Sequence, residues 1–178
     1  AWTWERQALV RARFIAGDER LGEQFHRVRR KILTSPFESF RASREAVSLV
    51  GDVASMRRKM KLAAIDKFGS DEKAKNDIKQ GDGGLIDIEF ITQYGVLQYG
   101  AQFEGLLEWT DNIRLLEALV KFKCFGVVDI SPLADVYRQL RSALHRKSLA
   151  DERYQVSLAD FAAQRQAVIK VWQQIFEI

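Results

Sequence analysis

The sequence predicts an all-α protein: a helical bundle of about seven helices with one long glycine-ended loop near residues 66–84. Apolar residues recur every three or four positions in most segments, which is the period of one helix face. The 178 residues include only two prolines and eleven glycines, too few for the many turns of a β-sandwich. Hydrophobic residues make up 47% and charged residues 29%, which excludes a disordered chain.

The first third of the chain is expected to form three helices, at residues 2–16, about 18–34 and about 41–65. Gly17-Asp18 breaks the first helix and Pro36 ends the second. The second and third segments each carry an apolar stripe, the pattern of a helix that turns one face to a core. The stripe in the second segment is Leu21, Phe25, Val28 and Ile32. The stripe in the third is Leu49, Val53, Met56, Met60 and Ala64.

Residues 66–84 are predicted to be a long loop. The stretch from Asp66 to Asn76 is polar, and Gly81-Asp82-Gly83-Gly84 follows. Loops of this length inside a compact domain are often functional or mobile.

Segment 85–99 can be interpreted in two ways. Ile86, Ile88 and Phe90 alternate with Asp87 and Glu89, which taken alone indicates a strand with two carboxylates on one face. The apolar pattern continues to Tyr99 without a turn, however, and that length favours a buried helix. On a helix the two acids lie about 200° apart and cannot form a side-by-side pair. The choice of secondary structure therefore decides the chemistry.

Three further helices complete the prediction. Thr110 or Asp111 can cap a helix over about 111–125, which Gly126 ends. Ser131-Pro132 opens a helix that runs to about residue 149. Ser157 with Asp160 resembles a capping box and starts a last helix that runs to residue 177.

The residue types present exclude several classes of site. A lone cysteine, Cys124, rules out a disulfide framework, is expected to pack in the core and is compatible with a reducing cytosol. The two histidines lie far apart in the sequence, so we expect no metal site. No apolar run of about 18 residues could cross a membrane, and no secretory signal opens the sequence. We therefore expect a cytoplasmic protein with no membrane partner.

The charge is uneven along the chain. Residues 1–65 hold 14 Lys and Arg against 7 Asp and Glu, whereas residues 66–178 hold 14 against 17. The basic part either decorates the outer faces of helices or faces an anion, such as a nucleotide polyphosphate or an acidic protein. A nucleic-acid partner rests on the pI of 9.3 alone and is not expected, because no binding motif accompanies it.

Two patches carry the densest polar signals. In the first, Lys79 precedes the glycines and a predicted helix start, where glycines allow close approach and free N–H groups attract phosphate. The alternative is a flexible loop with a glycine-rich helix start. In the second, Thr110, Asp111 and Asn112 are capping types. Capping does not explain Trp109 and Arg114 beside them, since this pair is common in recognition through stacking or cation–π contact. The second patch comprises residues 109–114.

These patches, KQGDGGLIDIEFITQY at residues 79–94 and WTDNIRLLE at 109–117, resemble the bifunctional glutamine synthetase adenylyltransferase/adenylyl-removing enzyme of bacteria. AWTWERQALVRAR at residues 1–13, MRRKM at 56–60 and LRSALH at 140–145 are similar to the same family. The resemblance covers nearly the whole chain in order. Ile86-Asp87 stands where the family's first half usually has Arg-Glu, so the chain is most similar to the C-terminal helical domain of the adenylylating half.

The resemblance implies a single helical domain, residues 1–178, of a larger multidomain enzyme whose nucleotidyltransferase palm precedes residue 1. The family transfers AMP from ATP to a tyrosine of glutamine synthetase, with magnesium, and removes it by phosphorolysis in its other half. A palm needs a Gly-Ser turn with a following Asp-x-Asp, which this sequence lacks. We expect no catalytic residue, no metal and no bound cofactor in this chain alone.

The resemblance also implies partners and a set of residues that face the nucleotide or the palm. The partners are the preceding nucleotidyltransferase domain, glutamine synthetase and the PII signalling protein. The implied residues are Lys79, Gly83, Gly84, Asp87, Glu89, Asp111, Asn112 and Arg114. The alternative is a non-catalytic helical protein-interaction or regulatory module. If residues 79–89 and 109–114 meet on one surface, the first interpretation gains support.

Overall fold

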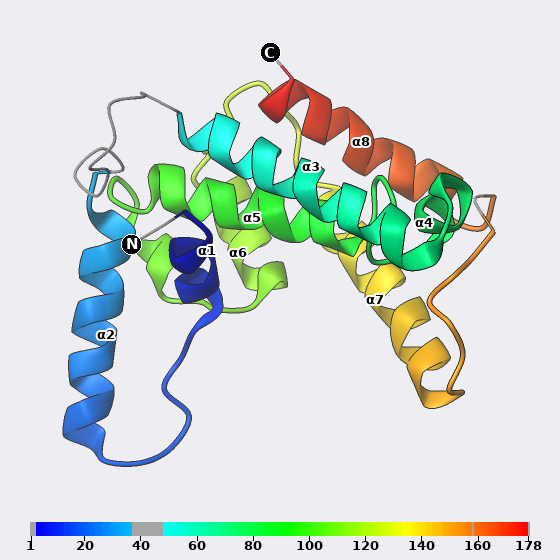
Figure 1. The fold of residues 1–178 in the computed structure, drawn as a ribbon. Helices are drawn as coiled ribbons and strands as arrows, with labels where there is room; N and C mark the ends of the chain where they lie inside the picture. Colours follow the sequence, from blue (N-terminus) through cyan, green and yellow to red (C-terminus); the bar gives the residue numbers. More distant parts are fainter. Residues whose placement is uncertain (1–2, 37–47, 158, 178) are drawn as a thin grey trace.

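The computed structural model describes residues 3–36, 48–157 and 159–177. Within these residues the chain forms eight α-helices, one short 3₁₀-helix and no β-strand, which confirms the all-α fold (Figure 1). The elements are α1 (Thr3–Arg11), α2 (Glu19–Thr34), α3 (Leu49–Phe68), α4 (Asp71–Asn76), α5 (Leu85–Tyr99), η2 (Glu104–Leu107), α6 (Asn112–Lys121), α7 (Leu133–Leu149) and α8 (Ala162–Phe176). No described helix is both long enough and apolar enough to cross a lipid bilayer.

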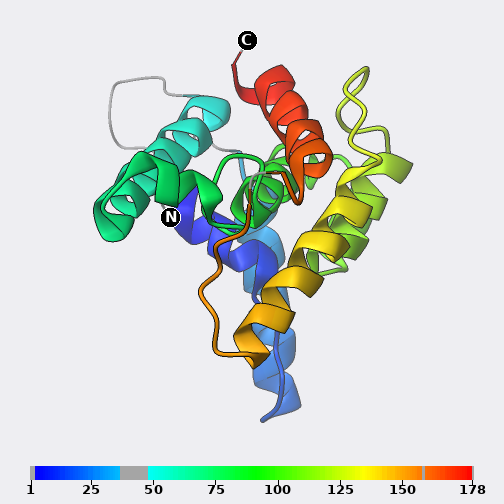
Figure 2. The ribbon, with the colours of Figure 1, turned by 90° about the vertical axis from the view of Figure 1, so that its right-hand side faces the viewer.

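Helix α5 is the centre of the bundle. Eleven of its fifteen residues are buried, because its apolar side chains occupy every side rather than one stripe. It packs against α1, α2, α3, α6, α7 and α8, and Figure 2 shows these helices arranged around it. The helical interpretation of segment 85–99 is therefore confirmed, and the buried side chains of α5 lie against other helices of the domain.

The predicted long loop is shorter than expected. Helix α3 continues to Phe68 and ends at Gly69, which has a left-handed φ of 77°. The short helix α4 follows, and the Ser70 side chain caps it by accepting the Lys73 N–H at 3.2 Å. The sequence did not reveal α4 because only Ala74 of its residues is buried, so no apolar period marks it. Residues 77–84 lack a helix, as predicted.

The predicted apolar stripe of α2 is not the side that packs on the core, since Phe25 and Ile32 are only half-buried. Leu21 and Val28 are 62% and 56% exposed, while Gly22, Arg29 and Leu33 are buried instead. The Arg29 guanidinium holds this side of the helix by donating to three backbone carbonyls, at 2.8–2.9 Å. In Figure 1 the N-terminal half of α2 extends well beyond the bundle.

Other helix limits differ by a few residues. Helix α1 ends at Arg11 rather than at residue 16, and residues 41–47 of the predicted third helix lie outside the described residues. Asp111 does cap α6, through an N–H···O bond of 3.0 Å. Helix α7 begins at Leu133 without a side-chain cap from Ser131.

The start of α8 also differs from the prediction. Ser157 and Asp160 bond locally, the Ser157 N–H donating to the Asp160 carboxylate at 3.2 Å. A turn intervenes, however, and the helix begins only at Ala162. The predicted cap therefore organises the turn before the helix rather than its first residue.

Candidate functional site

Asp87 and Glu89 lie on opposite sides of α5, as the helical interpretation predicts. Asp87 faces α3 through Arg57, whereas Glu89 contacts Arg11 of α1, Asn112 of α6 and Tyr137 of α7. The two acids therefore do not fit a shared magnesium site. Among the described residues no three His, Cys, Asp or Glu side chains gather as metal ligands would.

Asp87 belongs to a buried network that holds the glycine turn, residues 77–84. Its carboxylate lies 2.5 Å from the Arg57 Nε and accepts the Gly83 N–H at 2.7 Å. Arg57 also donates to the carbonyl of Gln80 at 2.7 Å. Burial raises the pKa of the Asp87 carboxyl, and the Arg57 charge and both hydrogen bonds oppose that rise. The carboxylate thus has its bonds within the domain.

Gly81 and Gly83 of this turn pack against Arg165 of α8, and Gly84 packs against the backbone of the turn itself. Gly83 and Gly84 are buried, and a Cβ on Gly83 would overlap the Arg165 carbonyl. Gly83 also has a φ of +68°, which glycine adopts readily. The Arg165 Nε donates to the Asp82 carbonyl at 2.8 Å, and its Nη2 donates to the Lys75 carbonyl at 2.5 Å. Packing within this chain therefore accounts for glycine at these positions.

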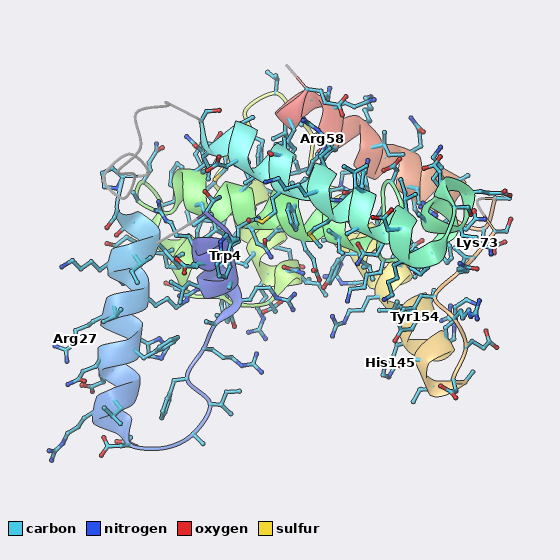
Figure 3. The ribbon with its side chains drawn as sticks, in the orientation of Figure 1. Trp4, Arg27, Arg58, Lys73, His145 and Tyr154 are labelled. Carbon is cyan, nitrogen blue, oxygen red and sulfur yellow. The ribbon has the colours of Figure 1, made fainter. Side chains whose placement is uncertain are left out.

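Lys79 lies in a different environment. Its side chain is exposed and lines a groove of about 430 Å³. Other basic residues that line this groove are Lys67, Lys73 and Arg153. Figure 3 shows Lys73 and Tyr154 at the same end of the molecule. Beneath the groove the buried Asp77 carboxylate accepts the backbone N–H groups of Lys79 and Gln80, at 2.8 and 2.6 Å.

Glu89 is the centre of a second polar network. Its Oε1 accepts from Arg11 Nη1 at 3.2 Å, from Asn112 Nδ2 at 3.3 Å and from the Tyr137 hydroxyl at 3.1 Å. Asn112 Nδ2 also donates to the Tyr137 hydroxyl at 2.8 Å. Burial and the Glu89 charge raise the pKa of Tyr137, which keeps its hydroxyl protonated as the donor to Glu89.

A cavity of about 560 Å³ opens beside this network. We call it the arginine cavity, lined by Arg11, Arg13, Ile15, Thr110, Asp111, Asn112, Ile113, Tyr137 and Arg141. Arg141 donates to the Tyr137 hydroxyl at 3.3 Å, and neither Arg13 nor Arg141 has a carboxylate partner in the described part of the chain. Helix α6 begins here, which adds the positive end of its dipole. Anionic groups would be stabilised in such a cavity.

The second sequence patch borders this cavity. The Arg114 guanidinium stacks over the Trp109 ring at 4.4 Å from its centroid, and lies 3.7 Å from Asp111. The structure thus brings together four predicted residues, and these are Glu89, Asp111, Asn112 and Arg114. It separates them from the Lys79 groove, which shares no lining residue with the arginine cavity.

Sequence reasoning missed the cavity's arginines and Tyr137. Arg11 and Arg13 fall in the opening segment, and Arg141 falls in the segment 140–145, both of which carry the family resemblance. The family resemblance of those two segments was the signal that could have identified these arginines. Their side chains converge only through the packing of α1 and α7 on α5.

Comparison with known proteins identifies the family. A family model described as GlnD PII-uridylyltransferase matches residues 54–173. The chain belongs to this family. A second model, described as glutamate-ammonia ligase adenylyltransferase, matches residues 1–28.

The names of the relatives of this chain agree with the family resemblance seen in its sequence. The chain is 40% identical over 177 residues to the bifunctional glutamine synthetase adenylyltransferase/adenylyl-removing enzyme of Nitrosococcus oceani. It is 38% identical over 183 residues to the enzyme of the same name from Pseudomonas putida. These alignments cover 99% and 98% of the chain but only 17% and 18% of the relatives, so the chain spans about a sixth of their length.

Proposed function

We propose that this chain is the helical domain that accompanies the nucleotidyltransferase palm in the adenylylating half of a glutamine synthetase adenylyltransferase. The palm, expected before residue 1, would bind ATP and magnesium and transfer AMP to a tyrosine of glutamine synthetase. The other half would remove AMP by phosphorolysis. The parent protein would act in the cytoplasm and respond to the PII signalling protein.

The observation that carries this proposal is the contact between Glu89, at the helical end of the first family patch, and the second patch beside one cavity, while the Lys79 end of the first patch lies apart. Glu89 comes from the first patch and Asn112 from the second, and they bond at 3.3 Å beside the arginine cavity. Arg13 and Arg141 supply guanidinium groups suited to phosphate oxygens. A palm seated over this cavity would present the phosphates of its nucleotide to these arginines.

The test uses the full-length enzyme and Arg141→Gln. We expect the apparent constant for ATP to rise about tenfold, the loss of one charged phosphate contact. Arg146→Gln is the matched control, because Arg146 lies on the same helix, is exposed, bonds Ser142 and lies outside the cavity. An ATP constant that Arg141→Gln leaves unchanged would remove the cavity from the nucleotide site.

Lys79, next to the turn that holds the buried Gly83 and Gly84, is proposed to face the nucleotide-binding palm from the other end of the domain. Lys79→Ala in the full-length enzyme should then also raise the constant for ATP. A second function is favoured by the separation of the two basic sites: the groove at Lys79 would instead bind an acidic surface of a protein partner. In that case Lys79→Ala would leave the ATP constant unchanged and weaken binding of glutamine synthetase or of PII.

The domain alone is proposed to be inactive. Asp87 and Glu89 are committed to Arg57 and to the Tyr137 network, so neither offers a free carboxylate pair for magnesium. Incubating the 178-residue chain with glutamine synthetase, magnesium and labelled ATP should give no transfer of AMP. Transfer above the level without protein would contradict the proposal.

A further inference from the structure

Helices α1 and α2 and the loop that joins them carry an apolar face that the domain itself leaves open to solvent. We call it the α1–α2 face, defined by Trp4, Ile15, Leu21 and Val28. Trp4 is 56% and Ile15 79% exposed, and Leu21 and Val28 are exposed to a similar extent. Figure 3 shows Trp4 on α1. Helix α1 packs directly against α2.

The face on α2 follows helical spacing. Leu21, Phe25 and Val28 lie at intervals of four and three, and so share one side of the helix. The helix packs on the bundle through a different side, that of Gly22, Arg29 and Leu33. Several exposed apolar side chains on one side of a helix are typical of an interaction site.

We propose that the α1–α2 face docks onto the nucleotidyltransferase domain that precedes this one in the longer polypeptide. The inference rests on the proposed function. All four residues of the face lie within residues 1–28, which match the adenylyltransferase family model, and none lies within residues 54–173, which match the other model. The relatives are more than five times longer than the chain, so most of their sequence lies outside it.

The position of Ile15 links this face to the arginine cavity. Ile15 belongs to the α1–α2 face and also lines the cavity. A domain that covers the cavity therefore reaches the α1–α2 face without a second docking surface. Burial of these side chains would supply the apolar contact, and the cavity the polar contact.

Charge at the border of the face specifies the docking surface further. Successive residues of a helix are about 100° apart around its axis, and this places Arg20, Arg27 and Lys31 together along one edge of the apolar stripe. None of them pairs with a carboxylate in residues 3–36, 48–157 or 159–177. Figure 3 shows Arg27 pointing away from the bundle. The complementary surface therefore has an apolar centre and an acidic border.

Thiol labelling of single-cysteine additions tests this docking. Val28→Cys and Glu23→Cys would each be made in the 178-residue chain and in the full-length protein. Glu23 is the matched control, because it is exposed on the opposite side of α2. The native Cys124 is buried and reacts slowly, and mass spectrometry separates its labelling. The rate of maleimide labelling is measured at each site.

We expect the cysteine at position 28 to react about tenfold more slowly in the full-length protein than in the chain. The cysteine at position 23 should react equally fast in both. Equal rates at position 28 would overturn the proposal. Slower labelling at position 28 in the 178-residue chain that increases with its concentration would also overturn it, because that result indicates a second copy. Slower labelling that requires added glutamine synthetase would overturn it as well. The labelling rates do not affect the ATP constant measured for Arg141→Gln. A failure of the docking proposal is therefore distinguishable from a failure of the proposed function.

Discussion

The Arg57 guanidinium and the Asp87 carboxylate form an ion pair with side chains only 1% and 5% exposed. The pair joins α3 to α5, and the Gly83 N–H and the Gln80 carbonyl add hydrogen bonds to it from the glycine turn. Because both charges are removed from water, each depends on the other far more than an exposed pair would.

Asp87→Asn should therefore destabilise the chain strongly. The change leaves the Arg57 charge buried without a counterion, which typically costs about 3–5 kcal/mol. Urea unfolding followed by circular dichroism measures the free energy of unfolding. Asp135→Asn is the control, since Asp135 pairs with Arg138 at the surface, and it should leave stability nearly unchanged. Equal effects of the two variants would contradict the role given to the buried pair.

Gly83→Ala should cost more than Gly69→Ala. Both glycines have positive φ, so each alanine should lose about 1 kcal/mol from backbone conformation. At Gly69 no atom lies within 4 Å of the added Cβ, whereas at Gly83 the Cβ meets the Arg165 backbone. We expect a total loss of at least about 3 kcal/mol for Gly83→Ala. Thermal and urea unfolding of both variants would reveal this difference, and similar losses would refute it.

Two leucines of α2 should differ in the same way. Leu33 is buried, so Leu33→Ala should lower the free energy of unfolding by about 3 kcal/mol. Leu21→Ala, on the exposed side, should change it by less than about 0.5 kcal/mol in the 178-residue chain. A large loss for Leu21→Ala in the isolated chain would mean that the stripe is buried after all.

Alkaline pH should weaken the fold through Tyr94. Burial among apolar side chains raises the pKa of Tyr94 to about 12. The unfolded chain loses this proton near pH 10 while the folded chain keeps it, so stability is fully present below pH 10 and falls as the pH rises to 12. The loss attributable to this group is about 2–3 kcal/mol.

Tyr94→Phe measures that contribution. The variant should match the wild type near pH 7 and lose less stability between pH 10 and 12, as followed by denaturant unfolding at each pH. Tyr154→Phe, at an exposed tyrosine, should keep the wild-type dependence. If Tyr94→Phe and the wild type lost stability in parallel, the assignment to Tyr94 would be wrong.

The sequence predicted the fold well where local signals are strong. The apolar pattern of residues 85–99, which continues to Tyr99 without a turn, identified α5, and Asp111 identified the start of α6. The short helix α4 was not predicted because a single apolar residue, Ala74, among its six residues forms no apolar period. The predicted orientation of α2 was wrong. The Arg29 guanidinium donates hydrogen bonds to three backbone carbonyls, so the side of the helix that carries Arg29 is buried in place of the apolar stripe.

The candidate site could be predicted only in part. Helical geometry alone separates Asp87 from Glu89, and the structure agrees. The bond between Glu89 and Asn112 joins residues 23 positions apart, and that between Glu89 and Tyr137 joins residues 48 apart. Such contacts depend on the packing of whole helices, which local periodicity does not specify.

The grip of Arg165 on the Lys75 and Asp82 carbonyls has a consequence for synthesis on the ribosome. Arg165 follows Asp82 by 83 residues, so translation completes the glycine turn long before its clamp exists. The hydrogen bonds to these two carbonyls can form only after Arg165 has been synthesised. Translational pausing or truncation ahead of codon 165 would thus leave the nascent bundle open at the amino end of its central helix.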